Sequence, residues 1–291
     1  MADINKRLFM NFPGEFFVDS TCINCDACRG IAPNVFAEAE DYAYVKAQPA
    51  NDEQERIALR ALIACPTGSI GTENPNNAAE VITDFPLHLE NGIYYCGFNS
   101  RKSYGGNSYF IEHPSGNWLI DSPRFHRHLV NRFKEMGGID FIFLSHRDDV
   151  ADAEKYAAEF SAQRIIHHKE LSAQPDAEIV IHETDPVEFL PDFLVIPTPE
   201  NPCSHVILLY KKRDLFSGDL LQWDLYRSRL VAPEFSGSSG RKSLATSLGK
   251  LQPFPFEYVL PAHGAWMRRS ADEMQQHFIR LIRSIRESKL Q

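Results

Sequence analysis

The stretch "TCINCDACRG", residues 21–30, places three cysteines at equal intervals: Cys22, Cys25 and Cys28. A fourth, Cys65, comes much later in "IACPTGSIG" and is followed at once by Pro66. Two residues between thiols let one tight loop wrap three sulfurs around a cubane of iron and sulfide, and the later Cys-Pro pair supplies the fourth ligand. The spacing therefore predicts one 4Fe-4S cluster held by these four cysteines.

Two other uses of the cysteines fit the sequence less well. A structural zinc site usually takes two C-x2-C pairs rather than a run of three thiols. A disulfide framework belongs to an oxidising compartment, but the start, "MADINKRLFMNFPGEFF", lacks the apolar core of a secretory signal. No apolar run is long enough to span a bilayer. We therefore expect a cytoplasmic protein that is not held in a membrane.

Residues 15–72 resemble a single-cluster bacterial-type ferredoxin, an α+β fold. The cysteine motif occurs once, so the resemblance implies one cluster and low-potential, one-electron transfer. The segment "NDEQERIALRALIACPTGSI", residues 51–70, reads as an amphipathic helix that delivers Cys65. A polar stretch, "TENPNNAAE" at 72–80, follows. We expect a ferredoxin domain over residues 1–75 and a second domain over 76–291.

Charge is unevenly distributed along the 291 residues, whose net charge is −9. Residues 1–80 carry 12 acidic and 6 basic side chains, which gives −6 in that part alone. Neither part has the basic footprint of a nucleic-acid-binding protein. The acidic excess of the first part suits docking onto a basic redox partner. All 11 histidines lie at or after His88, so only the second part can use imidazole ligands.

The second part alternates short apolar runs with helical stretches, which predicts layered sheets and helices. A helix is expected over 270–288, with one apolar face. A Gly/Ser-rich loop is expected over 233–243. Six motifs follow in order: "GGNSYFI", "WLIDSP", "FLSHRDD", "VIPTPENPCSH", "LFSGDLL" and "VLPAHG".

This order of motifs is similar to the metallo-β-lactamase superfamily over residues 88–266. The resemblance implies a C-terminal αββα sandwich, with one or two metals held by loops at one edge. His146 matches the first histidine of the H-x-H-x-D-H loop. Asp219 matches the bridging aspartate, and His263 matches the final histidine.

Other positions depart from the family pattern. Asp148 stands where the second loop histidine is expected, and Val150 and Ala151 replace the following aspartate and histidine. Asn201 takes the place of the later ligand histidine, while His205 matches a downstream histidine that is normally not a ligand. The resemblance thus implies a degenerate site. Its candidate metal ligands are His146, Asp148, Asp219, His263 and Asn201.

Several interpretations of this altered site remain open. One ion of iron, manganese or zinc could bind to the oxygen-rich set, with a second metal position weaker still. Alternatively, Asp148 and Asp149 could cap the following helix, and Asp219 and His263 could form a structural hydrogen bond.

The sequence leaves three alternatives for the function of the chain. The chain is expected to be an iron–sulfur electron-transfer protein whose cluster serves the attached domain, with a redox partner protein or a small-molecule substrate. It could instead be a mononuclear metallohydrolase acting on an ester, thioester or amide. The third alternative is a non-catalytic binding module in which the cluster acts as a sensor.

Overall fold

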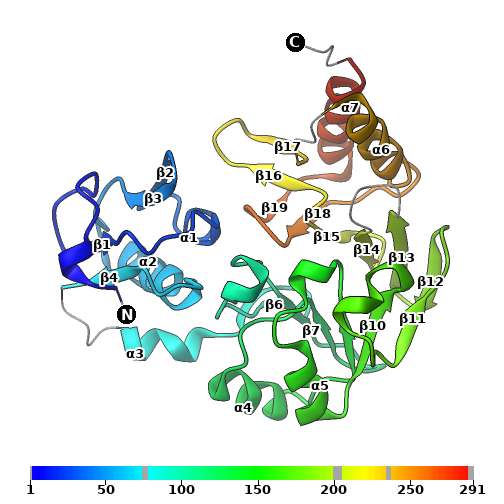
Figure 1. The fold of residues 1–291 in the computed structure, drawn as a ribbon, viewed down its shortest axis with the longest axis horizontal. Coiled ribbons are helices and arrows are strands. Elements are labelled where there is room, and N and C mark those ends of the chain that lie inside the picture. The colour runs from blue at the N-terminus through cyan, green and yellow to red at the C-terminus, as the bar shows by residue number, and fades with distance from the viewer. Residues whose placement is uncertain (1, 74–77, 199–204, 234–236, 288–291) are drawn as a thin grey trace. The chain divides into compact units, whose positions relative to one another are not determined.

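The computed structural model describes residues 2–73, 78–198, 205–233 and 237–287. The chain forms two compact units (Figure 1), one of Met1–Ile142 with Asp148–Gln163 and the other of Phe143–Arg147 with Arg164–Gln291. The predicted boundary at 75/76 lies inside the first unit, so independent folding of residues 1–75 stays a prediction. Across the described ranges, no helix is both long and apolar enough to span a membrane.

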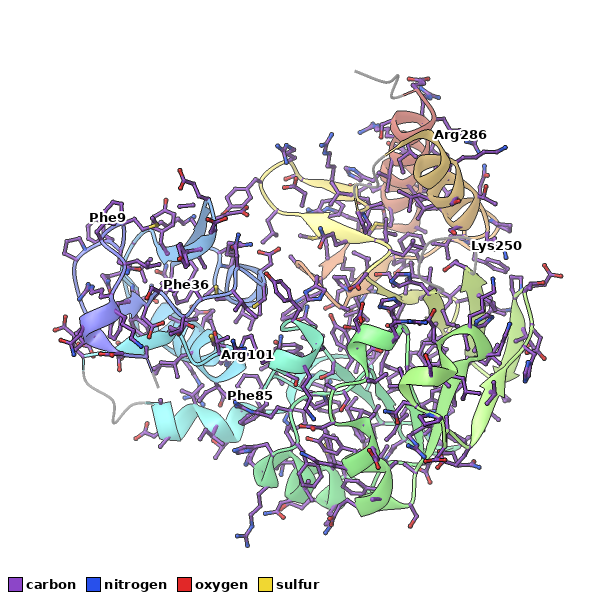
Figure 2. The ribbon with its side chains drawn as sticks, viewed as in Figure 1. Phe9, Phe36, Phe85, Arg101, Lys250 and Arg286 are labelled. Carbon is purple, nitrogen blue, oxygen red and sulfur yellow. The ribbon has the colours of Figure 1, made fainter. Side chains whose placement is uncertain are left out.

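The cysteine-rich region is a small α+β arrangement in the first unit. Strand β1 pairs antiparallel with β4, Val18 opposite Ile70, and β2 forms a hairpin with β3. Apolar side chains of the strands and helices, including the fully buried Phe36, form its core (Figure 2). Its elements are β1 (Phe16–Val18), α1 (Ala27–Ile31), β2 (Phe36–Ala39), β3 (Tyr42–Val45), α2 (Asp52–Ala64) and β4 (Ile70–Thr72), after the short helix η1 (Ile4–Lys6).

Helix α2 is defined at both ends by its sequence. The Asn51 side chain accepts a hydrogen bond from the Gln54 backbone N–H, which satisfies one donor of the first turn. The helix ends at Ala64 because Pro66 cannot continue the backbone hydrogen-bond pattern. Cys65 is the C-cap residue, so the helix end sets the position of the fourth thiol.

The rest of the first unit carries antiparallel strands and their helices. Strands β5 to β8 pair in sequence order, with Ile93 opposite Ile111 and Tyr109 opposite Ile120. Helix α4 packs on the sheet through stacked rings of Phe110 and Phe133. These elements are α3 (Ala78–Val81), η3 (Ile82–Asp84), β5 (Leu87–Glu90), β6 (Ile93–Tyr95), η4 (Arg101–Ser103), β7 (Tyr109–Ile111), β8 (Trp118–Ile120), α4 (Arg127–Glu135), β9 (Phe141–Phe143), η5 (Arg147–Asp149) and α5 (Ala153–Phe160).

The second unit contains a six-stranded sheet in the order β12-β13-β14-β15-β18-β19. Strands β15 and β18 are parallel, so their carboxyl ends reach the same edge. The elements of this part of the chain, in sequence order, are β10 (Gln163–His167), η6 (His168–Ala173), β11 (Ile179–Ile181), β12 (Val187–Leu190), β13 (Phe193–Thr198), β14 (His205–Tyr210), β15 (Asp214–Gly218), β16 (Gln222–Asp224), β17 (Arg229–Val231), α6 (Gly237–Gly249), β18 (Tyr258–Pro261), β19 (Met267–Arg268) and α7 (Ala271–Glu287).

Helices α6 and α7 share one apolar core with this sheet. Leu248 of α6 and Phe278 of α7 are fully buried in the same cluster as Ile207 and Val259 of the strands. The predicted helix over 270–288 is confirmed by α7. The predicted loop over 233–243 is wrong in part, because α6 begins at Gly237. Leu244 and Leu248 fall one turn apart on α6 and bury together, which favours a helix despite the small residues before them.

Candidate functional site

The four predicted cysteines line a single cavity in the first unit. Cys22 and Cys25 lie in the loop before α1, Cys28 lies in the helix itself, and Cys65 caps α2. Val18, Ile23, Ala27, Ala43, Pro66 and Ile70 are among the apolar residues that line the same cavity. All four cysteines are free thiols. Four sulfur donors around an apolar hollow are the ligand set that a 4Fe-4S cluster takes.

Backbone donors already point at two of these sulfurs. The Cys22 Sγ accepts from the N–H groups of Asn24 and Ala43, each at 3.4 Å. The Cys65 Sγ accepts from the Ser69 N–H at 3.3 Å. Hydrogen bonds to the sulfurs stabilise thiolate charge and tune the potential of a bound cluster. The loop is therefore arranged for deprotonated sulfur rather than for neutral thiols.

Burial has the opposite effect on these thiols, because it disfavours the charged form. It raises the pKa of Cys25 to about 12, and the neighbouring sulfurs of Cys65 and Cys22 add to the increase. Burial also raises the pKa of Cys28 well above its ordinary value. Without a metal these groups keep their protons, so loading the site must release them. The residues thus fit a 4Fe-4S cluster, whose iron would supply the positive charge that offsets the four thiolates.

A second group of possible ligands lies in the second unit, where His146, His205 and Asp219 converge. One ligand atom from each lies within 4.8 Å of the others. The Asp219 Oδ2 lies 3.9 Å from the His146 Nδ1 and 3.8 Å from the His205 Nε2. The other carboxylate oxygen, Oδ1, lies 3.8 Å from the His263 Nε2. The carboxylate therefore stands between two imidazoles on one side and a third imidazole on the other.

Strand ends and one glycine bring these residues together. The Val206 N–H donates to the Ser145 carbonyl at 2.9 Å, which fixes the start of β14 beside His146. The imidazoles of His146 and His205 stack with centroids 4.3 Å apart. Gly218 has a φ of +52°, and a Cβ there would lie 2.9 Å from the Ser145 Oγ. Only glycine lets the chain turn there without displacing the segment that carries His146.

The charges of this group suit a cation. Burial alone would raise the pKa of Asp219, but His205, His263 and His146 outweigh it and hold the pKa below its ordinary value. Within the described part of the chain, neither ring nitrogen of His205 has a hydrogen-bond partner, although the side chain is buried. A buried imidazole is stable when its nitrogens are satisfied. Two imidazoles and an ionised carboxylate fit one divalent metal ion.

The predicted metal ligands are distributed differently from the sequence interpretation. His146, Asp219 and His263 lie together in the second unit. Asp148 is exposed in the short helix η5, and it belongs to the first unit. Asn201 lies outside the described residues. His205 faces Asp219, although the motif comparison treated it as a non-ligand. The sequence signal that could have identified it was its position as the first residue of a buried strand.

Comparison with protein families matches residues 18–72 to the 4Fe-4S single cluster domain of Ferredoxin I. Residues 18–72 form a single-cluster ferredoxin domain. The match contains all four cysteines of the cavity, so the ferredoxin domain is confirmed, and the match supports a 4Fe-4S cluster there. A search of curated proteins found no match to the chain.

Solved structures show the fold of the larger part of the chain. The metallo-β-lactamase DIM-1 is 14% identical with a TM-score of 0.50, and the match covers 68% of this chain and 95% of that one. The structure of TMB-1 is 14% identical with a TM-score of 0.51, and the match covers 69% of this chain and 97% of that one. The metal-soaked Flv1 flavodiiron core from Synechocystis sp. PCC6803 is 15% identical with a TM-score of 0.47. The match covers 68% of this chain but 60% of the Flv1 core. The chain thus joins a ferredoxin domain to a metallo-β-lactamase fold, as predicted.

Proposed function

We propose that this chain is an iron–sulfur electron-transfer protein whose ferredoxin domain serves the attached metallo-β-lactamase-like part. The cavity lined by Cys22, Cys25, Cys28 and Cys65 carries this proposal. A bound 4Fe-4S cluster supplies reversible uptake of a single electron at low potential. The backbone N–H groups at Cys22 and Cys65 stabilise the sulfur charge, and the apolar lining limits water.

The second part of the proposal concerns one metal ion on His146, His205 and Asp219. Two imidazoles and one carboxylate are the donor set typical of non-haem iron(II), and they also accept manganese or zinc. Such an ion would supply redox chemistry or Lewis acidity to a small-molecule substrate. His263 lies on the other side of the carboxylate, with 27% of its side chain exposed, where it can hold a proton or orient a bound molecule.

The partners and the location follow from the same chemistry. The acidic excess of residues 1–80 suits a redox partner with a basic docking face, and no nucleic acid is expected. Free thiols and an iron–sulfur cluster need a reducing compartment, so we place the protein in the cytoplasm.

The test is an anaerobic redox titration of the full chain, combined with metal analysis. The cluster should take up one electron from dithionite and return it to a soluble one-electron acceptor. Iron beyond the cluster should depend on His205 and remain when Cys65 is replaced. A chain that binds zinc at the four cysteines, or that takes up no electron, would refute the proposal.

A hydrolase remains the second candidate because of His263. A metal-bound water beside a partly exposed imidazole is an arrangement suited to hydrolysis. DIM-1, a structural neighbour with this fold, is a metallo-β-lactamase by name. Lactam, ester and thioester test substrates should be cleaved slowly or not at all in the presence of added zinc. Rapid zinc-dependent cleavage that His205→Ala abolishes would favour the hydrolase over the electron-transfer protein.

A further inference from the structure

Residues 99–106, outside the ferredoxin domain but in the same compact unit, contact the surroundings of its cysteines at three points. The Asn99 N–H donates to the carbonyl of Ala64, next to Cys65, at 3.2 Å. The Tyr104 hydroxyl donates to the carbonyl of Ile23, between Cys22 and Cys25, at 2.6 Å. The third contact is made by Gly105, against Cys25 itself.

Gly105 approaches the sulfur more closely than any other residue type could. A Cβ at this position would lie 2.7 Å from the Cys25 Sγ and 3.0 Å from the Pro66 Cγ. Its φ of +87° is also a conformation that glycine adopts without strain. On the next residue, a Cβ at Gly106 would lie 2.8 Å from the Asp149 Oδ1. The two glycines are therefore held between a cluster ligand and a buried carboxylate.

A buried carboxamide holds this segment in place. The Asn99 Nδ2 donates to the Gly105 carbonyl at 2.7 Å and to the Asn107 Oδ1 at 3.2 Å. Its Oδ1 accepts from the Tyr95 hydroxyl at 2.8 Å. Asn99 and Tyr95 are fully buried, so each bond lies away from competing water. Without the carboxamide, the backbone at Gly105 loses the bond that presses it towards Cys25.

We propose that residues 99–106 form a cluster cover, positioned by Asn99, which keeps water and oxidants away from the Cys25 side of the cluster. This inference rests on the proposed 4Fe-4S cluster. Reduction makes a cluster with four thiolates more negative, and water stabilises the more highly charged form. Excluding water therefore lowers the midpoint potential of the cluster. Closing the cavity also slows the loss of the cluster by oxidation. Asn99 and Gly105 are positioning residues, contributed by sequence beyond the ferredoxin domain.

The decisive comparison is between Gly105→Ala and Gly138→Ala in the full chain. Both glycines have nearly the same φ, +87° and +89°, so both substitutions strain the backbone. A Cβ at Gly138 would meet its nearest neighbour, the Phe160 Cδ1, at an ordinary 3.6 Å. Gly105→Ala should raise the midpoint potential in a dye-mediated anaerobic titration. In air, the visible absorption of its cluster should also bleach several-fold faster than that of the Gly138→Ala variant.

Two further variants cover the case in which Gly105→Ala does not fold. Asn99→Ala should act in the same direction, and Asn117→Ala is its control, because Asn117 is a buried carboxamide bonded to the Met136 and Gly138 carbonyls. Tyr104→Phe removes one hydroxyl from an exposed ring, and the cluster of this variant should bleach slightly faster than that of the wild type. Suppose that the wild type holds a cluster, and that Gly105→Ala and Asn99→Ala match their controls, and Tyr104→Phe the wild type, in midpoint potential and bleaching rate. The cluster cover is then refuted, while the proposed electron-transfer function stands. A wild type without a cluster refutes the proposed function first.

Discussion

The two candidate sites of this protein are built in opposite ways. The thiol site takes three of its four ligands from the seven residues 22–28, on one loop and the start of one helix. The imidazole–carboxylate site takes His146, His205 and Asp219 from three separate strand ends. A ligand set on one loop is visible in the sequence spacing. A set assembled by a sheet becomes visible only when the strands are placed beside one another.

The sites also differ in how their ligand atoms are satisfied. Sulfur atoms of Cys22 and Cys65 accept backbone hydrogen bonds that favour a charged thiolate. By contrast, the ring nitrogens of His205 are buried without a hydrogen-bond partner among the described residues. A buried polar atom without a partner costs about 1–3 kcal/mol, which a bound ion would recover. The first site is stabilised by its own loop, and the second depends more on what binds to it.

The largest expected effect is at the thiol site. Cys65→Ala leaves three thiolates for four irons, so the protein should lose its visible charge-transfer absorption and most of its iron. Absorption spectra and iron counts of anaerobic protein measure this. Cys96→Ser is the control, because Cys96 is fully buried and does not line the cavity. A complete cluster in Cys65→Ala would remove the distinction between the two sites.

The next effect is at the imidazole–carboxylate site. Replacing a residue that only hydrogen-bonds to a metal ligand typically lowers metal affinity about 10–100-fold. Because His205→Ala removes a ligand itself, it should weaken metal binding by at least about a hundredfold. Competition with a chelator, in protein whose cluster has been removed by Cys65→Ala, measures the affinity. His182→Ala is the matched control, since His182 lies outside the ligand group. Equal affinities in both variants would mean that His205 is a structural histidine.

Gly218→Ala tests how the strands hold that site together. The added Cβ would lie 3.1 Å from the Ser145 Cβ and 3.5 Å from the His205 Cδ2, at a φ of +52°. We expect a loss of about 1–3 kcal/mol in the free energy of unfolding, from backbone strain and steric contact. Chemical denaturation measures it. Gly249→Ala should be neutral or better, because nothing lies within 4 Å of its Cβ position. Similar stabilities for both variants would argue against a close approach at Gly218.

The smallest effect is a pH dependence in the second unit, away from both sites. Hydrogen bonds from Arg164 lower the pKa of Glu178 from 4.5 to about 2, despite some burial. The folded state therefore favours the ionised form, so this stabilisation is present above pH 4.5 and is lost as pH falls towards 2. Because the Glu178 side chain is 38% exposed, Glu178→Gln should cost only about 1 kcal/mol near neutrality.

Denaturation curves at several pH values measure this difference. The stability difference between wild type and Glu178→Gln should shrink on acidification. A constant difference from neutral pH down to pH 2 would show that the carboxylate charge of Glu178 does not stabilise the fold.

Local patterns were sufficient for a large part of the fold. The cysteine spacing predicted the ferredoxin domain, and the family match over residues 18–72 confirms it. The apolar stripe of Met274, Phe278 and Ile282 predicted the last helix, and those side chains are buried on α7. The order of six motifs predicted the metallo-β-lactamase fold, which the comparison with DIM-1 shows. In each case residues close in sequence carry the signal, because helix period and loop geometry are short-range properties.

The sequence by itself determined which chemistry each region can offer: a four-cysteine motif before residue 70 and all the imidazoles after residue 87. Only the tertiary structure decided which of these groups meet. His205 faces Asp219 because Val206 bonds to Ser145 and Gly218 leaves room for both segments. Gly105 touches Cys25 although the two lie 80 positions apart in the sequence, through contacts that no motif records. Such pairs depend on how strands and loops pack, and packing is set by contacts that are distant in the chain.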